Sequence, residues 1–122
     1  MRLAIVGSRT FTDSLLMMEN LDRLNFVNTI EAFVSGGAGG ADSLARSVAK
    51  RFFAGKPFIE HLPDFERYGS PAALFVRNQK IVDDADELIA FFGPDGPTKG
   101  TDHAIRLARA KRIPIHIYWQ RT

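Results

Sequence analysis

Short apolar runs alternate with longer segments of helical period along the whole chain. Five runs show little polar alternation, as strands do when both faces of a sheet are covered, and four amphipathic segments separate them. This alternation is typical of βαβ units stacked around a buried parallel sheet. We therefore expect an α/β fold, a Rossmann-like three-layer sandwich with a mainly parallel sheet of about five strands.

The same pattern predicts where each element lies. The expected strands are Leu3 to Val6, Ala32 to Ser35, Pro57 to His61, Glu87 to Phe92 and Pro114 to Tyr118. The expected helices are Ser14 to Leu24, Ala41 to Phe53, Ala72 to Asp83 and Thr101 to Lys111. At 122 residues we expect a single domain over 1–122, with a ligand just beyond the carboxyl ends of the strands, where the strand order reverses.

Composition narrows the function classes. The net charge of +2 and the pI of about 9.2 favour an anionic partner but fall short of the dense basic patches of dedicated nucleic-acid binders. The absence of cysteine excludes disulfides, thiolate metal sites and cysteine nucleophiles. No signal segment and no apolar run of about 20 residues is found, so we expect a cytoplasmic protein that does not enter a membrane.

The most informative segment lies directly between a strand and a helix and reads Ser35-Gly36-Gly37-Ala38-Gly39-Gly40-Ala41-Asp42. Glycine admits positive φ, so consecutive N–H groups can turn toward an anion at the positive end of the following helix. We expect this loop to bind a phosphate through Ser35, Gly36, Gly37, Ala38, Gly39, Gly40 and Asp42. A plain NAD site is not expected, because Asp42 stands where a dinucleotide fingerprint has its third glycine. The alternative is a tight turn with Asp42 as a helix cap.

Two further loops at the same sheet edge carry polar side chains. Gly7-Ser8-Arg9 follows the first strand, and the guanidinium of Arg9 can form paired hydrogen bonds with a phosphate or carboxylate. Lys99-Gly100-Thr101 follows the fourth strand and adds a charge and a hydroxyl at a second helix start. The alternatives are a surface arginine, a solvated lysine and a threonine that only caps the helix.

The helix expected over Ala72 to Asp83 carries an amide in its apolar arc. At about 100° per residue, Asn78 falls in the middle of this arc and Arg77 at its flank. The rest of the arc is Leu74, Phe75, Ile81, Val82 and Ala85. A buried amide needs hydrogen-bond partners, so we expect Arg77 and Asn78 to point toward the ligand loops. The alternative is that Asn78 only ties down a neighbouring loop.

The remaining polar residues predict no metal site and no cofactor. His103 and His116 lack metal-ligand spacing with each other or with a nearby carboxylate. His61, Asp64 and Tyr68 follow the third strand, where contacts to a base or ribose compete with simple surface exposure.

The motifs Val6-Gly7-Ser8-Arg9, the glycine segment at 35–42, Arg77-Asn78 and Lys99-Gly100-Thr101 together resemble the SLOG superfamily, specifically its small YspA-like branch. The resemblance covers almost the whole chain. It implies a Rossmann-like domain of bacteria and their phages that binds nucleotides or nucleotide-derived ligands, frequently as a homodimer.

Related LOG-type phosphoribohydrolases cleave the base from nucleoside monophosphates with an arginine on the third helix and a glutamate after a Gly-Gly-x-Gly-Thr loop. Arg77 matches that arginine, which makes it the candidate catalytic residue. The glutamate has no counterpart, because Gly100-Thr101 is followed by Asp102-His103-Ala104, unless Asp102 substitutes from a shifted position.

Three functions follow from these observations. The main expectation is the binding or sensing of a nucleotide-derived small molecule, because the phosphate loop lacks a complete acid and base set. The second is hydrolysis of nucleoside monophosphates, with Arg77 and one of Asp102, His103 or Asp42 assisting departure of the base. The third is single-stranded DNA binding, as in DNA-processing relatives of the superfamily. The nearly balanced charge, and the lack of aromatic residues interleaved with basic ones, disfavour nucleic acid as a partner. We expect a small-molecule partner and a homodimer.

Overall fold

Within residues 1–121, which the structure describes, five strands form one parallel sheet. The structure is a computed structural model, and its strands are β1 (Arg2–Gly7), β2 (Ala32–Ser35), β3 (Phe58–Glu60), β4 (Glu87–Phe92) and β5 (Ile115–Trp119). The order across the sheet is β3-β2-β1-β4-β5, and every neighbouring pair is parallel. The chain builds outward from β1 to β3 and then restarts at β4 on the other side of β1. The strand order therefore reverses between β1 and β4.

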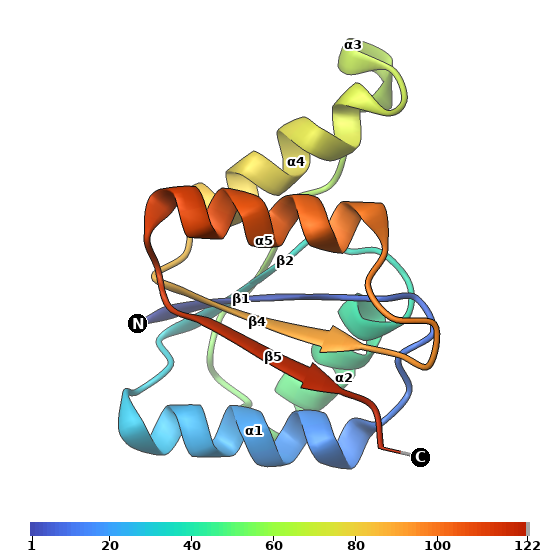
Figure 1. Cartoon of the computed structure of the whole chain (residues 1–122). Coiled ribbons are helices and arrows are strands. Elements are labelled where there is room, and N and C mark those ends of the chain that lie inside the picture. The colour runs from blue at the N-terminus through green and yellow to red at the C-terminus, as the bar shows by residue number, and fades with distance from the viewer. Residues whose placement is uncertain (122) are drawn as a thin grey trace.

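Helices cover both faces of this sheet, as Figure 1 shows. They are α1 (Ser14–Val27), α2 (Ala41–Phe52), α3 (Phe65–Tyr68), α4 (Ala72–Asp83) and α5 (Lys99–Lys111). The helices α1 and α2 lie on one face and α4 and α5 on the other, so the expected three-layer sandwich is confirmed. The short α3 was not expected. It is a single turn whose N-cap, Asp64, accepts a hydrogen bond from the Arg67 N–H.

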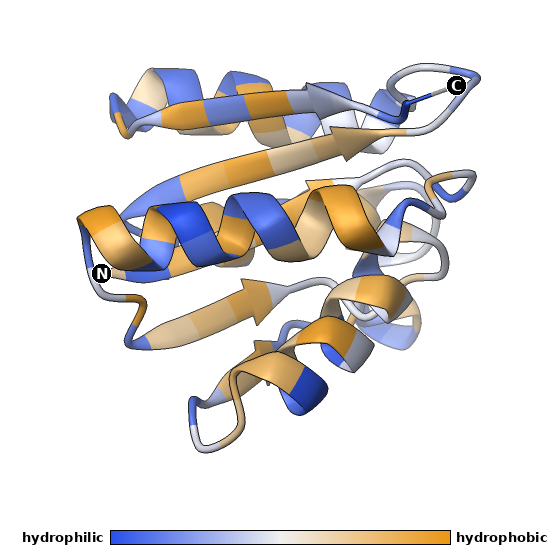
Figure 2. Ribbon diagram, turned by 90° about the horizontal axis from the view of Figure 1, so that it is seen from below, coloured by the Kyte–Doolittle hydropathy of each residue, from blue (hydrophilic) through white to orange (hydrophobic). Residues whose placement is uncertain are grey.

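Each strand of the sheet centre buries side chains on both faces. In β1, Leu3 and Ile5 belong to the cluster under α1 and α2, whereas Ala4 and Val6 belong to the cluster under α4 and α5. Successive residues of a strand point to opposite faces, so a strand covered on both sides is a continuous apolar run. Figure 2 shows this contrast, with largely hydrophobic central strands and helices that alternate between hydrophobic and hydrophilic residues.

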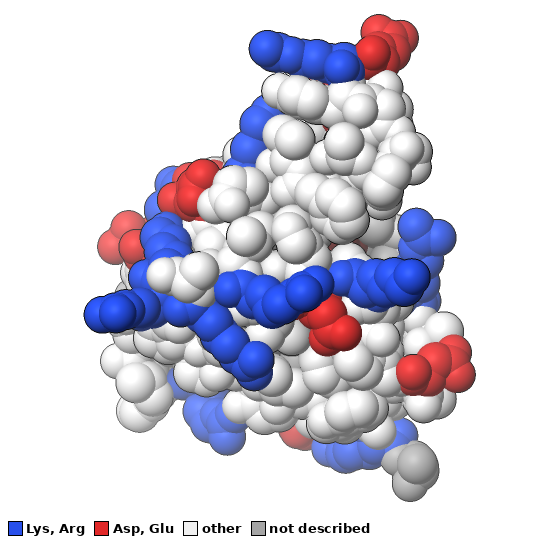
Figure 3. All heavy atoms as spheres, turned by 45° about the horizontal axis from the view of Figure 1, so that its top comes forward, with Lys and Arg blue, Asp and Glu red and all other residues white. Residues whose placement is uncertain are grey.

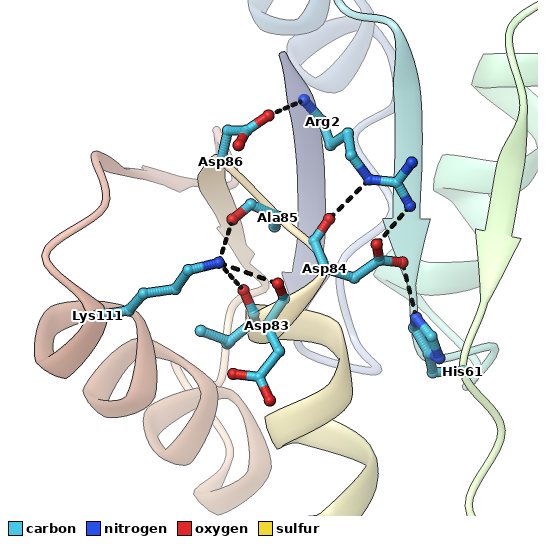
Figure 4. A network of polar contacts seen from close by, with 8 residues as sticks. Arg2, His61, Asp83, Asp84, Ala85, Asp86 and Lys111 are labelled. Carbon is cyan, nitrogen blue, oxygen red and sulfur yellow. Dashed lines mark hydrogen bonds and ion pairs between the residues drawn. The ribbon is translucent and has the colours of Figure 1, made fainter.

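A polar network joins the amino ends of the central strands to the end of α4 (Figure 4). The backbone N–H of Arg2 donates to Asp86 at 2.8 Å, and its guanidinium binds both the carbonyl and the carboxylate of Asp84. His61 lies 3.0 Å from the other oxygen of the Asp84 carboxylate. Burial alone would raise the pKa of Asp84, but the hydrogen bonds from His61 and Arg2 outweigh it and lower that pKa.

The end of α4 is capped by a lysine from α5. Lys111 Nζ donates to the carbonyl oxygens of Val82, Asp83 and Ala85 at 2.9, 3.1 and 2.7 Å (Figure 4). The last carbonyls of a helix have no partner within the helix, and a cation there also interacts favourably with the helix dipole. Lys111 thus fixes α4 against α5, and both helices line the site described below.

Among residues 1–121, no helix combines the length and apolar character needed to cross a membrane.

Replacing Lys111 with methionine tests the cap. We expect Lys111→Met to lower the free energy of unfolding by about 1–2 kcal/mol, because three carbonyl groups lose a charged donor. Lys80→Met is the matched control, since Lys80 is an exposed lysine in the last turn of α4 that makes no side-chain hydrogen bond within the described residues. Urea unfolding measures both, and equal losses for the two variants would contradict the cap.

Candidate functional site

A cavity of about 340 Å³ opens at the carboxyl ends of β1 and β4, where the strand order reverses. This is the position at which open α/β sheets bind ligands, and the volume lies near the small end of the range for ligand pockets. We call it the strand-end cavity. It is lined by Val6, Gly7, Arg9, Ala38, Gly39, Asp42, Leu74, Arg77, Asn78, Ile81, Thr98, Lys99, Gly100, Thr101 and Ala104.

Ser8 holds the segments around this cavity together. Its N–H donates to the Phe91 carbonyl at 3.0 Å, and its hydroxyl oxygen accepts the Gly93 N–H at 2.6 Å, which joins the ends of β1 and β4. Its carbonyl accepts the N–H of Ala41, the first residue of α2, at 3.2 Å. Ser8 is buried and does not line the strand-end cavity. Its observed contacts are therefore all structural.

The glycine loop brings bare backbone to the cavity edge at α2. Gly40 has a φ of 64°, and a Cβ there would stand 2.3 Å from the Cα of Arg9, so only glycine fits. A Cβ on Gly39, by contrast, would meet nothing within 4 Å. Within residues 1–121, the N–H groups of Gly39 and Ser43 make no hydrogen bond. Near the start of a helix such groups are donors for an anion.

Asp42 already occupies part of this loop. Its carboxylate accepts the Ala38 N–H at 3.0 Å, and the residue is buried. Burial raises the pKa of Asp42, against the opposing effects of that hydrogen bond and of the positive charge of Arg77. Among the described residues, Asp42 is the one carboxylate that lines the strand-end cavity. An anion that enters therefore meets a negative charge at the loop.

Arg77 and Asn78 join the glycine loop to the start of α5. The guanidinium of Arg77 donates to the Gly36 carbonyl at 2.7 Å and to the Asn78 side chain at 3.0 Å. The Asn78 amide donates to the Gly100 carbonyl and lies within hydrogen-bond distance of His103, both at 3.2 Å. Asn78 is buried, as its place on the helix predicts, and its contacts hold the start of α5 against α4. Both side chains also line the strand-end cavity.

Two cations stand at the cavity rim. Arg9 and Lys99 are exposed, line the strand-end cavity, and form no ion pair within residues 1–121. Lys99 begins α5, whose N-cap is Thr98, which accepts the Thr101 N–H at 3.2 Å. The helix thus begins two residues before the expected Thr101. Arg9 and Lys99 remain available to an anionic ligand.

The structure brings most of the predicted site residues to one place. Gly7, Arg9, Ala38, Gly39, Asp42, Arg77, Asn78, Lys99, Gly100 and Thr101 all line the strand-end cavity. Ser8, Ser35, Gly36, Gly37 and Gly40 do not line it, and they lie in the segments that shape it.

Sequence reasoning missed the apolar floor of the cavity, which consists of Val6, Leu74, Ile81 and Ala104, and also missed Thr98. A signal existed on α4, because Leu74 and Ile81 lie four residues before and three after Asn78, on the same helix face.

The strand-end cavity contains neither the candidate acid Asp102 nor, among the described residues, a cluster that could bind a metal ion. Asp102, the candidate substitute for the hydrolase glutamate, lines a different cavity between α5 and β5. Within the described part of the chain, no group of three or more His, Asp or Glu side chains is placed to hold a metal ion.

Comparisons with known proteins give one structural likeness. No family model matches the sequence, and no curated protein does either. The fold is similar to the solved structure of DNA processing protein A from Helicobacter pylori, which is described as having a unique single-stranded DNA binding mode. The TM-score is 0.70 at 21% sequence identity, and the match covers 99% of this chain and 66% of that one. This likeness shows a shared Rossmann-like fold.

The finding contradicts two of our expectations. We expected a nucleotide-derived small molecule as the main ligand and partner, and we disfavoured nucleic acid, whereas the protein with the matching fold binds single-stranded DNA. The physical reason for the error is that net charge averages over the whole surface. Figure 3 shows Lys and Arg side chains gathered in a band across the face that carries α5. A net charge of +2 does not reveal such a concentration.

Two alanine substitutions test the backbone geometry of the glycine loop. We expect Gly40→Ala to lower the free energy of unfolding by at least about 2 kcal/mol, because a left-handed φ and a collision with the Arg9 backbone act together. Gly39→Ala, one residue earlier, is the control and should leave stability unchanged, since its Cβ meets nothing. Thermal and urea unfolding of both variants check this, and a Gly40→Ala protein as stable as Gly39→Ala would refute the geometry.

Proposed function

We propose that the strand-end cavity binds single-stranded DNA. The observation that carries the proposal is the convergence of Arg9, Arg77 and Lys99, from three separate segments, on a cavity at the start of α2. The fold likeness to a single-stranded DNA-binding protein supports the same ligand.

The rim suits phosphate groups of a nucleic-acid backbone. Arg9 and Lys99 are exposed cations without ion-pair partners in the described chain, and the N–H group of Gly39, which also lines the cavity, makes no hydrogen bond there. Phosphate contacts from Arg, Lys and helix N-termini supply most of the sequence-independent affinity for nucleic acid. Arg77 adds a half-buried charge behind them, fixed by the Gly36 carbonyl.

The interior suits a single unpaired base better than a duplex. The floor of Val6, Leu74, Ile81 and Ala104 is apolar, and the volume is about 340 Å³. A base that is unstacked from its neighbours can enter such a recess and expose its faces to apolar side chains, whereas a duplex keeps its bases stacked inside. Single-stranded DNA therefore matches both the rim and the floor.

We also propose that the chain is a SLOG-type domain of the YspA-like kind. Support comes from the order of its motifs, since Gly7, Arg9, Gly39, Arg77 and Lys99 come from four successive motifs and all line one cavity. Within that superfamily, the ligand of the DNA-processing relatives, single-stranded DNA, is the one that fits this site.

Removal of one rim cation tests the proposed ligand. We expect Arg9→Ala to weaken binding of a fluorescein-labelled oligo(dT) about tenfold, the effect of losing about 1.5 kcal/mol from a charge-assisted hydrogen bond. The slope of log K against log salt should fall by about 0.7, the value for one phosphate contact on a single strand. Fluorescence anisotropy at several salt concentrations measures both quantities.

Arg51→Ala is the matched control, because Arg51 is an exposed arginine at the opposite end of α2. It removes the same charge away from the cavity and should change affinity little. Equal weakening by the two variants would mean that binding follows net charge and not this site, and no binding by the wild type would end the proposal.

Asp42 makes the binding pH-dependent. Its raised pKa means that the carboxylate takes up a proton at a higher pH than an ordinary aspartate does, and protonation removes the negative charge that opposes phosphate. We expect wild-type affinity for oligo(dT) to increase as the pH falls from neutral toward the raised pKa of Asp42. Asp42→Asn should bind more tightly than wild type at neutral pH, with a smaller increase as the pH falls.

His103 also lies near the cavity, and burial and then Arg106 lower its pKa. Its protonation would add to the pH dependence of both proteins alike, so the difference between wild type and Asp42→Asn isolates the carboxylate. Parallel pH profiles for the two proteins would show that Asp42 does not face the bound phosphate.

A further inference from the structure

A second cavity lies on the other flank of α5. It has a volume of about 420 Å³ and is lined by Phe92, Asp102, Ile105, Arg106, Arg109 and Ile117. We call it the α5–β5 cavity. It differs from the strand-end cavity, with which it shares no lining residue, although both are built against α5.

Arginines dominate the charge of this cavity. Arg106 and Arg109 are exposed residues of α5, the helix on the face that Figure 3 shows, and Asp102 is the one carboxylate among the lining residues. Neither arginine forms an ion pair within residues 1–121. Positive charges without partners are available to a polyanion, which makes the surface complementary to phosphates.

A large aromatic side chain packs against Phe92, one of the residues that line this cavity. Trp119 is 57% exposed, and it lies on the same face of β5 as Ile117, two residues earlier. Its ring meets that of Phe92, a lining residue of the α5–β5 cavity, edge to face, with the ring centroids 4.9 Å apart. The indole is therefore held in place by Phe92 while much of its surface remains open. Rigid exposed rings next to cations are the stacking platforms of proteins that bind single strands.

We propose that single-stranded DNA held in the strand-end cavity continues across α5, with a base stacked on Trp119 and phosphates bound by Arg106 and Arg109. This extension rests on the proposed function for its ligand. At 1.5 Å per residue, Lys99 and Arg109 are about 15 Å apart along the axis of α5, so a strand of several nucleotides reaches from one cavity to the other. One DNA strand would therefore contact the protein on both flanks of α5, at the strand-end cavity and at the α5–β5 cavity.

The sequence supplies its own reporter for this proposal. Trp119 is the one tryptophan in the chain, so intrinsic indole fluorescence reports on this position alone. We expect dT15 to quench the emission of the wild type. We expect dT3, which is too short to span α5, to compete for the strand-end cavity with little quenching at the same occupancy. Competition against labelled dT15, followed by anisotropy, measures the occupancy independently.

Substitutions separate the two contact points. Trp119→Ala and the double variant Arg106→Ala/Arg109→Ala should each weaken dT15 binding at least about fivefold and leave dT3 binding unchanged. The double variant Lys50→Ala/Arg51→Ala, at the far end of α2, removes the same charge and is the control. Trp119→Phe keeps an aromatic ring and should retain most of the affinity for dT15, which distinguishes stacking from a loss of folding.

The outcomes distinguish this inference from the proposed function. If no oligonucleotide binds, the proposed function fails. If dT15 binds and Arg9→Ala weakens it, but the emission of Trp119 does not change and the α5–β5 variants bind as wild type, the proposed function stands and the extension is overturned. If Trp119 emission changes with protein concentration alone, the surface serves self-association, which overturns the extension as well.

Discussion

Ser8 is the constraint on which the arrangement of the site depends. It is a buried serine with a backbone donor, a backbone acceptor and a hydroxyl acceptor, and each of them bonds to a different segment: β4, the start of α2 and the loop that follows β4. These bonds hold the ends of the two strands on either side of the order reversal beside the glycine loop. The Arg9 backbone, one residue later, then lies so close to Gly40 that only glycine fits there. The same close contact therefore sets the position of Arg9 and the requirement for glycine at position 40.

Charge distribution decides what this geometry can bind. A protein with a net charge of +2 is nearly balanced, but its ion pairs lie mainly elsewhere, such as Arg46 with Glu60 and Arg121 with Asp13. The cations of α5 keep no such partners within residues 1–121, and Lys111 is committed to backbone carbonyls. The face that carries α5 thus presents positive charges without internal partners. An extended polyanion gains from such a surface in a way that a small anion does not.

Much of the fold could be predicted from the sequence, because the continuous apolar runs of the strands and the helical period of the segments between them were both clear. The strand Ala32–Ser35 and the helix Ala72–Asp83 have the expected bounds, and the buried position of Asn78 follows from its place on the helix. The short α3 was missed because a single turn carries no periodic signal. Among the site residues, Ser8 was expected to contact ligand, but its type says nothing about whether its bonds go to a ligand or to neighbouring backbone.

The proposed ligand class was difficult to predict from the sequence for a similar reason. An aromatic row interleaved with basic residues is a pattern along one segment, whereas Trp119 and Arg106 come from a strand and a helix that are adjacent only after folding. The same holds for Arg9, Arg77 and Lys99, which are distant in the chain and line one cavity. Long-range juxtaposition, not residue type, carries the functional information here.

Backbone amide NMR of the 13.6 kDa protein during titration with oligo(dT) tests the central claim most directly. The account predicts that the largest shift changes fall on Gly39, Arg9 and Lys99, the residues that offer an unbonded N–H group or an unpaired cation at the strand-end cavity. Resonances of the groove between α1 and α2, such as those of Leu15 and Ser47, should stay in place. Largest changes at that groove, or uniform small changes without saturation, would contradict a DNA site at the carboxyl ends of the strands.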